Sequence, residues 1–175
     1  MLVITGNHFK TGDRSLIRKY ANYVLNRFVR KGILKKSRIT IKVLSEEEVD
    51  DEDLTDFKQY RAWCTYDGND NAVKKFTVTL NLRQMRNSKN IRTRMGRLFI
   101  DLGHELVHVK QYLNGEMRDY ADGSYKFLGK RYNPIPNETF SEEYFDSPSE
   151  IEAYGREQGL LTMFWHKVDK GEITL

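Results

Sequence analysis

The sequence is poor in cysteine. It contains a single one, Cys64, among 175 residues. One thiol cannot form an internal disulfide, which is typical of proteins from reducing compartments. It also excludes zinc sites that are built from several cysteines. Any metal site in this chain must therefore use histidine and carboxylate side chains.

Long apolar runs are also missing. No segment approaches the roughly 18 consecutive apolar residues that identify a membrane helix. The first residues, Met1 to Gly6, lack the basic segment that begins a signal peptide. These absences predict an intracellular, cytoplasmic protein without a membrane partner. No repeat and no Pro- or Ser-rich linker divides the sequence, so we expect one domain over residues 1–175.

The charge is mildly basic, with a formal net charge of +4 and a pI near 9.0. The basic residues gather in two runs, at 27–36 and 83–97. Solvated helix faces explain both runs, and a surface that binds nucleic acid is the alternative.

Residue patterning predicts three helices and three strands. We expect helices over 15–32, ending at Gly32, over 91–113, and from Ser147-Pro148 to about Trp165 with Ser147 as the N-cap. Alternation of polar and apolar residues predicts strands at 38–44, 61–66 and 76–82. The acidic stretch 46–56 should form a short helix or loop, and 123–137 irregular structure with one hairpin. This order indicates an α+β domain with a small antiparallel or mixed sheet.

The helix expected over 91–113 contains His104-Glu105-Leu106-Val107-His108. The spacing places both imidazoles one helical turn apart, where they can reach a single ion, and Glu105 beside them. Apolar residues occupy a separate stripe, on the side of the helix roughly opposite the histidines. These are Met95, Leu98, Phe99, Leu102, Leu106, Val109 and Leu113. Exposed histidines without a metal are the simpler alternative, but the intervening glutamate favours a metal site.

A catalytic zinc ion needs three protein ligands and an open position, and the last helix offers the third. Glu150 and Glu157 lie on an otherwise apolar stripe of this helix, whereas Glu152 lies on the other side and can pair with Arg156 in solvent. Glu150 is therefore the best ligand, although it also fits a capping box that begins at Ser147. Glu157 is better suited to orient a ligand than to bind the metal.

These residues resemble the zincin metallopeptidases of the gluzincin type, whose third zinc ligand is a glutamate on a later helix. The segment Glu150-Ile151-Glu152-Ala153-Tyr154 is similar to their second motif, with Tyr154 where those families carry Asp or Asn. The compact layout also resembles small SprT-like and phage-encoded proteins with the same histidine motif. The matching residues lie between Asp101 and Glu157.

The resemblance implies a zinc metallopeptidase with a minimal zincin-like fold. His104, His108 and Glu150 would hold Zn²⁺, and Glu105 would be the general base for a metal-activated water. A polypeptide substrate would bind in extended form along an edge strand, for which 76–82 is the candidate; the alternative is that 76–82 is an ordinary internal strand. Tyr132 or Tyr144 could stabilise the oxyanion. The alternative is a non-catalytic metal-binding module that binds nucleic acid or protein through its basic face.

Overall fold

A computed structural model describes residues 1–6, 9, 12–45, 62–67, 73–82, 85, 87–134 and 141–175. The acidic stretch 46–56 lies outside these residues. The strands are β1 (Leu2–Thr5), β2 (Ser37–Leu44), β3 (Ala62–Tyr66), β4 (Lys74–Asn81), β5 (Met117–Asp119), β6 (Tyr125–Phe127) and β7 (Lys130–Tyr132). The helices are α1 (Asp13–Phe28), α2 (Lys31–Lys35), α4 (Ile91–Leu113), α5 (Glu142–Phe145) and α6 (Pro148–Asp169). The architecture is α+β with a mixed sheet, as the sequence predicts.

The larger sheet has four strands in the order β1-β2-β4-β3. Strands β1, β2 and β4 are parallel, and β3 runs antiparallel to β4. The predicted alternation is confirmed, because Ile39, Ile41 and Val43 of β2 share a buried face with Phe76, Val78 and Leu80 of β4. Strand β1 was not predicted. It pairs with β2 on the side of β2 that faces away from β4.

The strand predicted to bind substrate is not at an edge. β4 is hydrogen-bonded to β2 on one side and to β3 on the other, so its backbone groups are already paired. Among the described strands, β3 has one neighbour and forms the edge on that side of the sheet. On this side of the sheet an extended peptide can therefore be added beside β3 but not beside β4, so 76–82 is an ordinary internal strand and its assignment as the binding strand is wrong.

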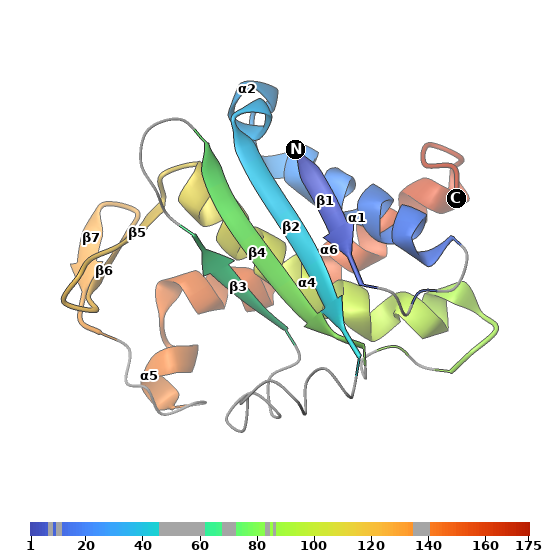
Figure 1. Ribbon diagram of the computed structural model, residues 1–175. Coiled ribbons are helices and arrows are strands. Elements are labelled where there is room, and N and C mark those ends of the chain that lie inside the picture. The colour runs from blue at the N-terminus through green and yellow to red at the C-terminus, as the bar shows by residue number, and fades with distance from the viewer. Residues whose placement is uncertain are drawn as a thin grey trace.

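Helices α1 and α4 pack on one face of this sheet, and α6 lies on the same side, packed against these two helices (Figure 1). Helix α4 has its predicted bounds, and the Asn90 side chain caps it by accepting hydrogen bonds from the backbone N–H groups of Arg92 and Thr93. All seven residues of its predicted apolar stripe are buried. The opposite side of α4 packs against α6, so α4 is enclosed on two sides. None of the helices in the described ranges is both long and apolar enough to cross a membrane.

Two predicted boundaries are wrong. Helix α1 ends at Phe28, because Val29 takes an extended backbone with its side chain buried in the core, and Gly32 lies inside the short helix α2. Helix α6 continues one turn past Trp165. The one hairpin predicted within 123–137 is confirmed as β6 and β7, and β5, which precedes that region, pairs with β6 to complete a three-stranded antiparallel sheet.

Close packing of α1 on α4 depends on Gly103, which immediately precedes His104. A Cβ atom at Gly103 would lie 2.6 Å from the hydroxyl oxygen of Tyr20. Tyr20 itself is fully buried and stacks on Phe99, with ring centroids 4.3 Å apart. The hydroxyl therefore has little freedom to move away from an added methyl group.

We predict that Gly103→Ala lowers the free energy of unfolding by about 1–3 kcal/mol because of overpacking. The control is Gly96→Ala in the same helix, where an added Cβ has no neighbour within 4 Å. That change should raise stability by roughly 0.5–1 kcal/mol through helix propensity. Urea unfolding measures both, and equal stabilisation by the two substitutions would contradict this account of the packing.

Candidate metal centre

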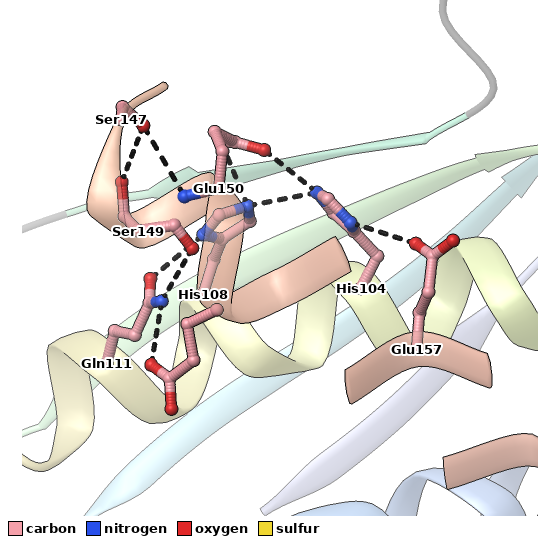
Figure 2. A network of polar contacts seen from close by, with 8 residues as sticks. His104, His108, Gln111, Ser147, Ser149, Glu150 and Glu157 are labelled. Atoms are coloured by element: carbon pink, nitrogen blue, oxygen red, sulfur yellow. Dashed lines mark hydrogen bonds and ion pairs between the residues drawn. The ribbon is translucent and has the colours of Figure 1, made fainter. Parts of the chain in front are cut away.

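His104, His108 and Glu150 meet in the interface between α4 and α6 (Figure 2). The two Nε2 atoms are 3.2 Å apart. Oε2 of Glu150 lies 3.1 Å from Nε2 of His104, and Oε1 of Glu150 lies 3.2 Å from Nε2 of His108. The structure thus brings together the three residues that the sequence predicts as ligands.

The start of α6 directs the Glu150 carboxylate toward the histidines. Ser147 caps the helix, and its hydroxyl accepts a hydrogen bond from the backbone N–H of Glu150. In a capping box the glutamate would bond back to the N–H of Ser147, but that group donates to the carbonyl oxygen of Tyr144 at 3.1 Å. The cap therefore forms without the Glu150 side chain, which is left to contact both imidazoles.

A second layer of acceptors fixes the two rings. Nδ1 of His104 lies 3.1 Å from Oε2 of Glu157, and Nδ1 of His108 lies 2.9 Å from Oε1 of Gln111. Bonds of this kind orient metal-binding histidines and leave Nε2 as the ligand atom. Glu157 has the orienting position expected for it. The Asp or Asn expected at position 154 is replaced by Tyr154, whose ring packs edge-on against His104.

The remaining glutamate of this helix, Glu152, does not reach the cluster. It pairs with Arg156 as predicted, at 2.8 Å, but it also bonds to the buried residues Lys110 and Gln111. These two contacts are not predicted from the sequence, because Lys110 and Gln111 follow the motif as polar residues with no pattern that indicates burial. Only the packing of α6 over them shows that they are buried.

The donor set fits a zinc ion. Zinc bonds to imidazole nitrogen and carboxylate oxygen are about 2.0–2.2 Å long, so neighbouring ligands in a tetrahedral site lie roughly 3.3–3.5 Å apart. The two Nε2 atoms are 3.2 Å apart, and one ligand atom from each of the three residues lies within 4.8 Å of the others. The 3.1 and 3.2 Å contacts of Glu150 use different oxygens, so the carboxylate would bind one ion either with both oxygens or after a turn. Two imidazoles favour zinc over Ca²⁺ or Mg²⁺, which prefer oxygen ligands.

Mutual hydrogen bonds control the charges of the cluster. Burial alone would lower the pKa of His104, but its bonds to Glu150 and Glu157 raise it to about 10. Burial would raise the pKa of Glu150, but the bonds to both histidines hold it well below its ordinary value. The His104 ring faces carboxylates at both nitrogens, and because a carboxylate accepts, the ring donates from both. A metal ion must therefore displace a proton from Nε2.

Glu105 lies beside the cluster, at the side of α4 that faces the edge strand. It is buried, and burial raises its pKa against the opposing charges of His108 and His104. Burial and the nearby charge of Glu105 also raise the pKa of the Cys64 thiol on β3. Glu105 is thus close enough to act electrostatically on both histidines and on Cys64 of the edge strand β3.

Of the two tyrosines considered for the oxyanion, Tyr144 is at the site. Burial, the charge of Glu150 and a hydrogen bond to Glu150 all raise the pKa of Tyr144. Tyr132 instead stacks on Tyr125 in the small sheet, with centroids 5.2 Å apart. Asp101, where the matching residues begin, pairs with Arg97 at 3.3 Å.

No protein-family model, curated protein or solved structure matches this chain. Its chemistry must therefore be inferred from the residues and geometry of the site.

We predict that zinc binding releases at least one proton at neutral pH, from Nε2 of His104, and that affinity increases with pH. The pKa of His104 lies near 10, so below that value each unit of lower pH should weaken binding by up to roughly tenfold. Titration calorimetry in buffers with different ionisation enthalpies measures the proton release. An exposed histidine serves as the control, because His166→Ala should not change the result. Zinc binding without proton release would contradict the assigned charge of His104.

Proposed function

We propose that this protein is a zinc-dependent hydrolase that cleaves peptide bonds, a metallopeptidase similar to the gluzincins. The observation that carries the proposal is the buried group of two Nε2 atoms and one carboxylate, with a separate carboxylate, Glu105, one residue after the first ligand. A purely structural zinc site would be closed by four protein ligands. Here only three such groups meet among the described residues.

The metal would be held by His104, His108 and Glu150, with Glu157 and Gln111 orienting the two rings. Zinc, when bound, supplies a Lewis acid that acidifies water and polarises a carbonyl group. Glu105 would accept the proton of the attacking water and deliver it to the leaving amine, and its raised pKa suits a group that both accepts and donates a proton. Tyr144 is the hydroxyl best positioned to stabilise the developing negative charge.

Strand β3 is the proposed binding edge for an extended polypeptide. Ala62, Cys64 and Tyr66 face the helices, because they pair with the inward-facing residues of β4. A peptide hydrogen-bonded to β3 would run past the end of Glu105, and its side chains would alternate between the cluster and solvent. Tyr66 stacks on Phe76 and contacts Tyr112, which gives this end of the edge an aromatic lining.

We predict that Glu105→Gln preserves zinc binding and reduces hydrolysis of a denatured protein such as casein by at least about 10²-fold, the range for loss of a general base. The control is Glu143→Gln on the exposed surface of α5, which should retain full activity. Peptide release and bound zinc are measured on the same samples. Parent-like hydrolysis by the Glu105→Gln protein would refute its role as the base.

A second candidate function, a module that binds nucleic acid, is favoured by one observation. Residues 14–45 contain ten Lys and Arg and no Asp or Glu. Around α2 the basic side chains are exposed, and Arg38 on β2 lies directly beside Lys75 on β4. Like charges in register on neighbouring strands repel each other. A phosphate backbone would relieve this repulsion.

For this candidate, reversing the charges of Arg30, Lys31 and Lys35 should weaken binding to duplex DNA and flatten its salt dependence. Each lost phosphate contact should reduce the slope of log K against log salt by roughly 0.9. The matched control reverses three exposed charges of the small sheet: Arg118, Lys126 and Lys130. Fluorescence anisotropy measures binding. Equal effects of the two sets, or no binding by the parent, would argue against this function.

A further inference from the structure

Gln111 is completely buried, and every polar atom of its side chain has a partner. Its amide nitrogen donates to the carbonyl oxygen of Ser149 at 3.0 Å and to Oε2 of Glu152 at 3.1 Å. Its amide oxygen lies 2.9 Å from Nδ1 of His108. These contacts connect the end of α4 to the first turns of α6 (Figure 2).

The partners leave one orientation for this amide. A backbone carbonyl and an ionised carboxylate only accept hydrogen bonds, so the NH₂ group of Gln111 must face Ser149 and Glu152. Its oxygen is then fixed toward His108, and Nδ1 of that ring must be the protonated nitrogen. When the ring is neutral its lone pair is consequently at Nε2, and while Nε2 still carries a proton it donates to Oε1 of Glu150, 3.2 Å away.

Glu152 is kept ionised by two cations. Nζ of Lys110 lies 2.6 Å and Nε of Arg156 lies 2.8 Å from its Oε1 atom. Both cations contact Oε1, which leaves Oε2 to accept from Gln111. The carboxylate is therefore a fixed acceptor, in contact with Gln111 but with neither histidine.

We propose that Glu152 is a positioning residue that selects the tautomer of His108 through Gln111 and so presents Nε2 to the metal. The inference rests on the proposed metal site, because the tautomer has a function only if Nε2 binds an ion. A structural role, as an ion pair joining α4 to α6 through Lys110, would by contrast be independent of the orientation of the Gln111 amide.

The test is a swap of the amide and the carboxylate. In Glu152→Gln the new amide can donate to Gln111, and only the carbonyl oxygen of Ser149 then holds the NH₂ group of Gln111, so this amide can turn part of the time and offer His108 a donor instead of an acceptor. We expect zinc affinity, measured by chelator competition, to fall about tenfold, the lower end of the range for loss of an orienting partner. Adding Gln111→Glu should restore the tautomer and part of the affinity. A carboxylate at 111 can only accept from His108 while the amide at 152 donates to it, but its other oxygen faces the carbonyl of Ser149. Arg156→Gln, which leaves the Glu152 acceptor in place, is the control and should bind zinc like the parent.

A second measurement does not require the metal. Long-range ¹H–¹⁵N NMR after chelation, at a pH where the His108 ring is neutral, should show the Nδ1–H form in the parent and in the swap, and a mixture in Glu152→Gln. Parent-like affinity and tautomer in a folded Glu152→Gln protein would overturn the proposal, as would a swap that fails to recover either property. A parent that binds no zinc would refute the metal site, and the NMR result would still decide whether Glu152 selects the tautomer.

Discussion

The structure depends on one constraint: the polar side chains buried between α4 and α6 must form hydrogen bonds with one another. Two imidazoles and a carboxylate in a helix interface are costly unless every donor and acceptor is matched. The Glu150 carboxylate contacts Nε2 of both histidines. Glu157 accepts from Nδ1 of His104, and Gln111 accepts from Nδ1 of His108. This matching fixes how α6 lies on α4, and it collects three zinc-type donors at one point.

Helix α4 has two different faces, one apolar and one that carries the polar side chains in contact with α6. Helix α4 packs on β3, β4 and α1, and at Gly103 the hydroxyl of Tyr20 approaches it closely. The motif residues are therefore held by a helix that has little freedom to rotate or shift. Glu105 lies toward the edge strand β3, so the side that would meet a substrate is separate from the side that packs against α6. Rigid placement of this kind is what a proton-transferring carboxylate requires.

The sequence was sufficient where local pattern decides the structure. The apolar stripe and the Asn90 cap define α4, and the inward stripe of the last helix singled out Glu150 from its neighbouring glutamates. The sequence was insufficient where a residue's contacts come from segments far away in the chain. The contacts of Glu152 with Lys110 and Gln111 exist only because α6 packs over α4. The end of α1 depends on burial of Val29, and the edge position of β3 depends on strand order, which no single strand encodes.

The most direct test of a zinc centre is a crystal structure of the zinc-loaded protein with anomalous data collected at the zinc edge. The account predicts one anomalous peak, about 2.0–2.2 Å from Nε2 of His104, Nε2 of His108 and a carboxylate oxygen of Glu150, with a fourth position not taken by protein. A peak coordinated by Glu152 or Glu157 instead of Glu150, or no peak between α4 and α6, would contradict it.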